Sequence, residues 1–333
     1  MMKALHIVVP DLFLPGELAA DVGAGLHLPV LEKIMARGDS RPLALTSLEA
    51  WLCSIFGVPE AAIAPVTLRA DGVPPEQGYW LRADPVHLRL EREQMILQTN
   101  VAPSSTEAAV LCAYLNAHFA DSGMRFFAPH PQRWYVRLDE APALETYPVS
   151  QVEGRNARSY MPQGGQALQW HGILNEIQMA LYAHPLSEAS AQQGILAVNS
   201  VWLWGGGYAA ELTRVFDRLY GGCELAQAFA RAVQIPCVPD FPASPLAGGR
   251  SLYVWDGLNS ALRRGDFYAW RESLLALERD CLSPALDALR AGDVGRITLD
   301  VLQEEGSRRY ELSRAMLWRV WRRAQPLARQ RLV

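Results

Sequence analysis

Short apolar runs alternate with amphipathic segments along the chain, and this pattern is typical of a mixed α/β protein. Runs at 5–9, 251–256 and 297–301 are apolar and partly β-branched, so they predict buried strands. Apolar residues at helical spacing predict helices at 28–37, 46–57, 106–120, 169–183 and 265–290. Strands that alternate with helices favour a mostly parallel sheet covered by helices.

The pattern of apolar and polar residues along the chain changes after about residue 66. Residues 66–90 hold β-prone pieces separated by Gly and Pro, and two further strand-like pieces follow the helix at 106–120. We therefore expect an α/β core made of residues 1–62 and 185–333. A smaller α+β domain of residues 63–184 is expected to be inserted into it.

The most distinctive stretch is 195–221, which predicts an apolar strand, a turn at Gly205, Gly206 and Gly207, and an amphipathic helix. A glycine turn before a helix can hold a phosphate, because helix N–H groups point outward there. The stretch matches neither the GxGxxG motif nor the GK[ST] loop, so it contains neither of these nucleotide-binding motifs. Tight packing of the turn is the alternative explanation.

Three aspartates, Asp11, Asp256 and Asp300, each follow or end an apolar strand. Carboxylates at strand ends can converge on a divalent metal. The alternative for each is a turn or helix-cap role, which is common for Asp.

Other polar residues carry weaker signals. Arg82 and Arg89 flank His87 in a strand-like segment and could meet an anion, although a solvated sheet face has the same pattern. His171 and Asn175 share one helix face, and this pair indicates a polar interface rather than a metal site.

Composition limits the class of protein. The chain has 333 residues, half of them hydrophobic, which predicts about two domains and excludes wholesale disorder. No apolar run is long enough to span a membrane, and the N-terminus lacks the features of a signal peptide. Five dispersed cysteines without CxxC spacing predict a reduced, cytoplasmic protein.

The net charge of −4 argues against a general nucleic-acid binder. Residues 308–333 nevertheless contain eight Arg and one Glu, with Trp318 and Trp321 interleaved. Such a segment could bind nucleic acid or an acidic surface. Its alternation favours an edge strand guarded by Arg.

Several segments together resemble a known family. Five segments occur in the order seen in archaeal-type cofactor-independent phosphoglycerate mutases: the strand before Asp11, LPVLEKIMARG, TSLEAWLCSIFGVPE, LRADPVHLRL and VNSVWLWGGG. Three segments are also similar to a bacterial regulatory-protein family of the RpfE type: RADPVHLR, NEIQMALYAHP and NSVWLWGGG. The resemblance implies an alkaline-phosphatase-like core, with a mostly parallel sheet flanked by helices and an inserted smaller α+β domain.

The mutases hold two metals with Asp and His ligands around a Ser nucleophile. The resemblance implies Ser47 or Thr46 as nucleophile and Asp11, Asp256 and Asp300 as metal ligands. The expected histidines are missing, because residues 257–266 contain none and none follows Asp300.

These departures predict a catalytically degenerate relative that is regulatory or binds a small anion such as a phosphorylated metabolite. The expected binding residues are Arg82, Arg89, Asn199, Trp204, Gly205, Gly206 and Gly207. No cofactor, nucleic acid or membrane partner is expected. The alternative is a metal-dependent phosphatase or phosphotransferase that uses Mg²⁺ or Mn²⁺, the three aspartates, and Ser47 or Thr46.

Overall fold

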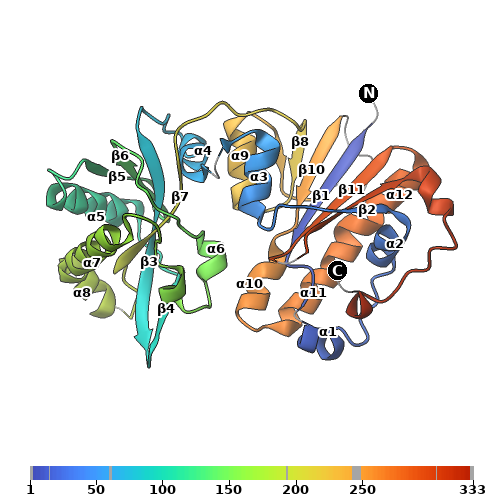
Figure 1. Ribbon diagram of the computed structural model, residues 1–333, viewed down its shortest axis with the longest axis horizontal. Helices are drawn as coiled ribbons and strands as arrows, with labels where there is room; N and C mark the ends of the chain where they lie inside the picture. The colour runs from blue at the N-terminus through green and yellow to red at the C-terminus, as the bar shows by residue number, and fades with distance from the viewer. Residues whose placement is uncertain are drawn as a thin grey trace. The chain divides into compact units, whose positions relative to one another are not determined.

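The computed structural model describes residues 3–14, 16–59, 62–192, 194–241, 249–304 and 306–330 (Figure 1). The chain forms two compact units. The first is Met1–Phe56 with Leu212–Val333, and the second is Gly57–Glu211.

The first unit is built on a seven-stranded sheet. Five of its strands pair in parallel, β12 pairs antiparallel with the outermost of them, and β2 pairs antiparallel with β12. In sheet order the strands are β2 (Asp39–Pro42), β12 (Arg308–Ser313), β11 (Arg296–Leu302), β1 (Ala4–Pro10), β10 (Arg250–Val254), β8 (Arg218–Tyr220) and β9 (Cys237–Val238).

Helices cover both faces of this sheet. Because side chains alternate along a strand, Leu5, Ile7 and Val9 of β1 join the core on one face, and His6 points to the other. The first face carries α1 (Gly16–Val22), α2 (Pro29–Arg37), α10 (Gly257–Arg263), α11 (Phe267–Leu277) and α12 (Ser283–Ala291). The second face carries α3 (Leu48–Phe56) and α9 (Glu224–Ala232). The expected fold class, a parallel-rich sheet flanked by helices, is confirmed.

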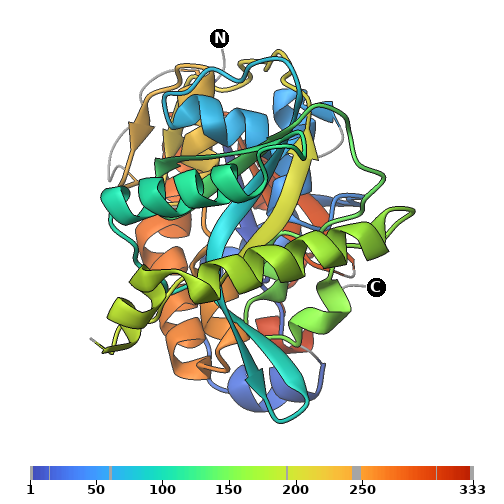
Figure 2. The same ribbon diagram turned by 90° about the vertical axis from the view of Figure 1, so that its left-hand side faces the viewer.

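The second unit is an antiparallel sheet with helices on both faces. Its strands are β3 (Tyr79–Glu91), β4 (Gln94–Gln98), β5 (Met124–His130), β6 (Arg133–Leu138) and β7 (Ser200–Gly207). Two long helices, α5 (Ser105–His118) and α7 (Ala167–Ala183), cover one face, as Figure 2 shows. Their buried side chains belong to one hydrophobic core. The short α4 (Ile63–Ala70) packs on the other face. The shorter α6 (Val149–Val152) and α8 (Pro185–Gln192) complete the unit.

The structure corrects the prediction for 195–221. Gly205, Gly206 and Gly207 are the end of strand β7 rather than a turn, and residues 208–216 contain no helix. Strand β7 pairs with β3 from Trp80 to Val86, so it lies in the second unit, whereas the sequence analysis assigned it to the core.

The structure also corrects the prediction for the C-terminal segment. Only Arg308–Ser313 form a strand, and β2 covers its outer side, so β12 is not the edge of the sheet. Residues Arg314–Trp318 form a 3-10 helix instead. Side-chain hydrogen bonds, rather than pairing with another strand, hold this segment in place. Arg319 donates to Asp39, and Arg37 donates to the carbonyl of Leu317. Among the described residues, no helix combines the length and the hydrophobicity that a bilayer crossing requires.

Candidate functional site

Asp300 lies in the middle of β11 and is fully buried. Arg309 lies directly opposite Asp300 on β12, so its guanidinium contacts the carboxylate in a bidentate manner. Arg309 Nε donates to Asp300 Oδ1 and Nη2 donates to Oδ2, both at 2.6 Å. A bidentate guanidinium–carboxylate pair of this kind is among the strongest hydrogen-bonded contacts in proteins.

Two aromatic side chains complete the surroundings of Asp300. His6 Nε2 lies 2.8 Å from Oδ2, and Trp51 Nε1 donates to the same oxygen at 2.7 Å. Burial by itself raises the pKa of Asp300, but the hydrogen bonds from Arg309 and His6 outweigh it and hold that pKa at about 2. The carboxylate is therefore ionised and its oxygens are occupied by donors.

The proposed nucleophile position lies at the start of α3. Ser47 Oγ accepts a hydrogen bond from the amide of Ala50 at 3.2 Å, so Ser47 caps the helix. Trp51 follows one turn later and reaches Asp300, so the structure brings Ser47 and Asp300 to the same side of the sheet. Thr46 is exposed.

Asp11 follows β1 with a left-handed backbone, at φ 53°. Its carboxylate accepts a hydrogen bond from Asn259 on α10, and Asn259 in turn accepts one from Arg263. Asp300 pairs with Val8, three residues before Asp11, which corresponds to about 10 Å along the strand. Asp11 and Asp300 therefore do not come together as strand-end ligands.

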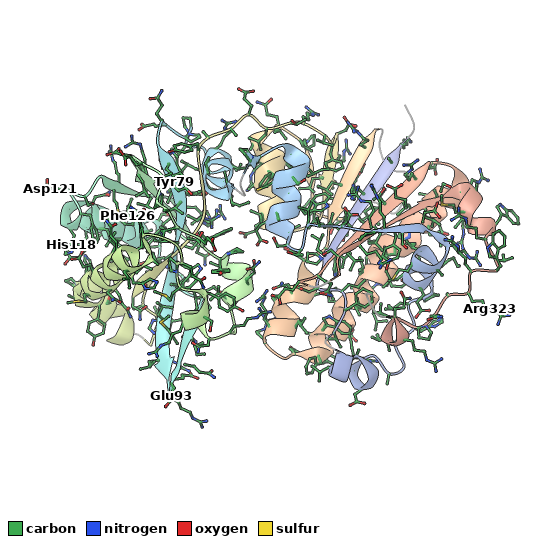
Figure 3. All side chains as sticks on the ribbon, in the orientation of Figure 1. Tyr79, Glu93, His118, Asp121, Phe126 and Arg323 are labelled. Atoms are coloured by element: carbon green, nitrogen blue, oxygen red, sulfur yellow. The ribbon has the colours of Figure 1, made fainter. Side chains whose placement is uncertain are left out.

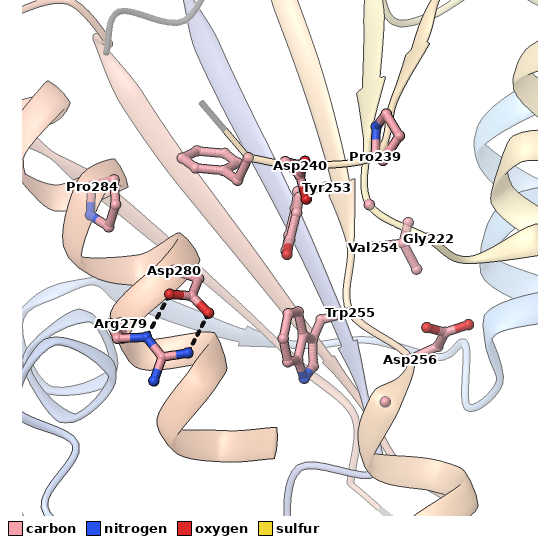
Figure 4. A pocket seen from close by; sticks show the side chains of 13 residues that line it. Gly222, Pro239, Asp240, Tyr253, Val254, Trp255, Asp256, Arg279, Asp280 and Pro284 are labelled. Atoms are coloured by element: carbon pink, nitrogen blue, oxygen red, sulfur yellow. Dashed lines mark hydrogen bonds and ion pairs between the residues drawn. The ribbon is translucent and has the colours of Figure 1, made fainter. Parts of the chain in front are cut away.

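Asp256 is exposed and directly precedes α10. It lines a pocket of about 620 Å³ at the carboxyl ends of β8 and β10, together with Trp255, Tyr253, Asp240 and Asp280 (Figure 4). The arginine that lines the pocket, Arg279, is paired with Asp280. A phosphorylated ligand in this pocket would face three carboxylates and one neutralised guanidinium.

The residues present do not fit the metal centre that the fold family implies. Both carboxylate oxygens of Asp300 accept hydrogen bonds from N–H groups, and the carboxylate of Asp11 accepts one from the side-chain amide of Asn259. Within the described ranges, no group of three or more His, Cys, Asp and Glu side chains is arranged to hold a metal ion.

The expected anion-binding residues have partners within the fold. Arg82 is buried and donates to Asp84 Oδ1 through Nε and Nη2, at 2.9 and 2.6 Å. Its guanidinium also stacks on the rings of Tyr135 and Trp204, and Trp204 Nε1 donates to the other Asp84 oxygen at 2.7 Å. The positive charge of Arg82 is thus balanced by Asp84.

Arg89 lies farther along β3, and Asn199 directly precedes β7. The Asn199 amide bonds both the N–H and the carbonyl of Leu88, which ties the two strands together. Arg89 forms an exposed ion pair with Glu91. Seven residues of strand separate it from Arg82, about 23 Å, so the two arginines do not share one small ligand.

Gly205 and Gly207 let α4 approach β7, and Gly206 leaves room for Tyr79 of β3. A Cβ atom on Gly207 would lie 2.2 Å from the Cβ of Ala62, and one on Gly205 would lie 2.9 Å from Ile63. On Gly206 it would lie 2.4 Å from the hydroxyl of Tyr79. Close packing, the alternative weighed from the sequence, accounts for these glycines.

Sequence reasoning missed four residues that define this region: Arg309, His6, Trp51 and Asn259. Trp51 carried a usable signal, since it lies four residues after Ser47 on the same helix face. Arg309 carried none, because it is one of eight arginines in its segment and only the strand register pairs it with Asp300.

Comparisons with known proteins agree with a phosphoglycerate-mutase-like relationship at low identity. No protein-family model matches the chain. Over 120 residues it is 28% identical to the 2,3-bisphosphoglycerate-independent phosphoglycerate mutase of Methanosarcina acetivorans, covering 35% of this chain and 30% of that protein. Over 75 residues it is 27% identical to a probable enzyme of the same name from Geobacter sulfurreducens, covering 22% of this chain and 19% of that protein. The matched region thus spans less than a third of these relatives.

Two solved structures are similar over most of the chain. The PH0037 protein from Pyrococcus horikoshii has a TM-score of 0.54 at 13% identity, covering 94% of this chain and 87% of that one. This likeness shows the shared fold. The cofactor-independent phosphoglycerate mutase from Thermoplasma acidophilum has a TM-score of 0.46 at 13% identity, covering 94% and 90%.

Proposed function

We propose that this chain is a phosphoglycerate-mutase-like protein that has lost metal-dependent phosphoryl transfer and serves a regulatory, ligand-binding role. The observation that carries the proposal is the Asp300–Arg309 pair. In it, a fixed guanidinium supplies the positive charge that a metal ion would bring to this carboxylate.

A guanidinium cannot replace a metal in the chemistry itself. It stays protonated at all working pH values and has no open coordination position. Catalytic metal sites depend on such a position, since it holds and activates the reacting oxygen. The pair therefore preserves the charge balance of the fold without the chemistry.

The regulatory role rests on the resemblance of RADPVHLR and NSVWLWGGG to the bacterial regulatory family. The ligand class, a small phosphorylated metabolite, rests on the likeness to the phosphoglycerate mutases. Thermal unfolding with 3-phosphoglycerate up to about 10 mM tests this part, because a ligand that binds the native state raises the Tm in a saturable way. No rise in Tm contradicts the ligand class and leaves the loss of catalysis unaffected.

Loss of catalysis is tested with the purified chain and Mn²⁺ or Mg²⁺. The assays are hydrolysis of p-nitrophenyl phosphate and interconversion of phosphoglycerates, with bound metal measured after gel filtration. We expect no metal-dependent turnover and no stoichiometric metal. The variants are Asp256→Asn and Asp300→Asn, and Asp293→Asn is the control because Asp293 is an exposed loop residue.

A metal-dependent phosphatase or phosphotransferase is the second candidate. One observation favours it: α3 places Ser47 one turn before Trp51, which contacts Asp300. Turnover that both Asp256→Asn and Ser47→Ala abolish, and that Asp293→Asn leaves intact, would establish this candidate and overturn the first.

A further inference from the structure

The pocket at the carboxyl ends of β8 and β10 has more carboxylates than cations among its described lining residues. Asp240 and Asp256 are exposed, and within the described ranges neither has an ion-pair partner. The third carboxylate, Asp280, is paired with Arg279 through hydrogen bonds of 2.6 and 2.7 Å. Arg323 of the C-terminal segment lies at the outer edge of the first unit, away from α10 and the pocket beside it (Figure 3). Three carboxylates and one guanidinium thus leave a net charge of −2 on the lining.

Three aromatic side chains also line this pocket. Tyr253 and Trp255 are two residues apart in an extended segment, so their rings lie on the same side and stack with 6.2 Å between centroids. Phe241 contacts the Tyr253 ring edge to face at 5.3 Å. Trp255 Nε1 donates to Ser273 Oγ at 3.1 Å, which fixes the indole. Such rings favour organic cations over anions, because the face of an aromatic ring carries partial negative charge.

The Tyr253 hydroxyl is a polar group aimed into the pocket. The side chain is only 4% exposed, and its hydroxyl points toward the pocket interior (Figure 4). Among the described residues this hydroxyl has no hydrogen-bond partner. Burial, with added negative charge from residues that include Asp280 and Asp240, raises the pKa of Tyr253, so the phenol keeps its proton. A buried polar group without a partner is costly, and a ligand N–H that donates to the phenol oxygen removes that cost.

The two carboxylates without ion pairs follow different strands. Asp240 comes after β9 and Asp256 after β10, and β8 lies between these strands in the sheet. Two interstrand spacings separate the strand ends by about 10 Å. This spacing suits one metal ion poorly, because metal–oxygen distances are about 2.0–2.6 Å. It suits two positive groups joined by a flexible chain, with a hydrogen bond of ~3 Å at each end.

Other classes of ligand fit this lining less well. An anion meets a net negative charge, because Arg279 is already neutralised by Asp280. A neutral apolar ligand takes water from Asp240 and Asp256 without replacing its hydrogen bonds, which is costly. A ligand with a single positive charge balances only half of the net charge, whereas a dication balances all of it.

We propose that this pocket binds an aliphatic diamine or polyamine, with one ammonium group at Asp240 and another at Asp256. The Tyr253 oxygen accepts a hydrogen bond from an amine nitrogen, and the methylene groups of the ligand lie against the rings of Trp255 and Phe241. The pocket volume of about 620 Å³ is within the range of small-molecule sites. This ligand is a cation, so the inference does not rest on the phosphorylated ligand proposed above.

Isothermal titration calorimetry of the full chain with putrescine tests the proposal, at an ionic strength of about 0.05 M where screening is weak. We expect saturable one-to-one binding that is at least about tenfold tighter than binding of butylamine, which has one ammonium group. The neutral isostere 1,4-butanediol should not bind. Displacement of putrescine by an equal concentration of Mg²⁺ would identify a metal site and overturn the proposal.

Substitutions in the pocket locate the binding. Asp240→Asn and Asp256→Asn should each weaken putrescine binding about tenfold, because each removes a charge-assisted hydrogen bond. Tyr253→Phe removes only the hydroxyl and should weaken binding about threefold. Asp293→Asn is the matched control, since Asp293 is an exposed carboxylate outside the pocket, and it should keep the wild-type affinity.

Thermal unfolding confirms that each variant is folded before it is titrated. The proposal is wrong if the wild type does not bind putrescine, or if butylamine binds equally well. It is also wrong if Asp240→Asn and Asp256→Asn change the affinity no more than Asp293→Asn does.

Discussion

Asp300 receives hydrogen bonds from three elements of the first unit: β12, β1 and α3. A buried carboxylate without these donors would be costly, because its charge would lose its hydration and gain no partner. The same contacts that disable Asp300 as a metal ligand therefore contribute to the stability of the core.

Replacing Arg309 should reveal that contribution. In Arg309→Gln a fully buried carboxylate loses its bidentate partner, so we expect the free energy of unfolding to fall by about 3 kcal/mol. Urea denaturation at pH 7 measures it. Arg290→Gln is the control, because the pair between Arg290 and Asp287 is exposed and should change stability by less than about 0.5 kcal/mol. Equal effects of the two substitutions would contradict this role of Arg309.

Asp300 also makes stability depend on pH. Its pKa of about 2 in the folded chain lies below the value of about 3.9 in an unfolded chain. A lowered pKa stabilises the fold above pH 4, and this contribution, ~2 kcal/mol, is lost as the pH falls from about 4 to 2. Urea denaturation across that range should show a steeper loss for the wild type than for Asp300→Asn. Identical slopes would contradict it.

At the level of elements, the contact between α4 and β7 decides the role of the glycines. A Cβ on Gly207 would collide with Ala62, which has no flexible end to move aside. We expect Gly207→Ala to lower the free energy of unfolding by about 1–3 kcal/mol through overpacking. In Gly165→Ala, the new Cβ lies at an ordinary 3.8 Å from Ala143, so its effect should stay within about 0.5 kcal/mol. Thermal unfolding compares the two, and a neutral Gly207→Ala would show that α4 can shift.

The same element shows where sequence reasoning stops. The pattern of 195–221 predicted a strand before Gly205, and β7 does contain Ser200–Trp204, but the three glycines continue the strand instead of forming a turn. The pattern could not show that β7 pairs with β3, more than 110 residues earlier. Without that pairing, a glycine run before an amphipathic stretch has the same local signature as a turn before a helix.

For the whole molecule, the two compact units predict where the chain can be divided. The fragment 57–211 keeps β7 against β3, so we expect it to unfold cooperatively in urea by far-UV circular dichroism. The fragment 63–184 uses the boundaries drawn from the sequence and lacks β7, which leaves Trp80–Val86 with one neighbouring strand fewer. We expect this shorter fragment to lose cooperativity. Equal cooperativity of the two fragments would favour the boundaries at 63 and 184.

The sequence by itself determined the local features of this protein: the apolar strands, the amphipathic helices and the strand-to-helix alternation of the core. These features follow from the periodicity of apolar residues, which depends only on residues that are close together in the sequence. It also showed that the histidines of the related mutases are missing. The resemblance to those mutases named Asp300 as a metal-ligand position.

Only the tertiary structure decided what Asp300 contacts. Its partners come from residues 6, 51 and 309, and a strand register, rather than any local motif, brings them together. The exposed face of α7 is a similar case, because packing against the sheet decides which residues of the helix remain uncovered. Contacts between distant segments depend on how the whole chain folds, and local sequence patterns do not specify which distant segments become neighbours.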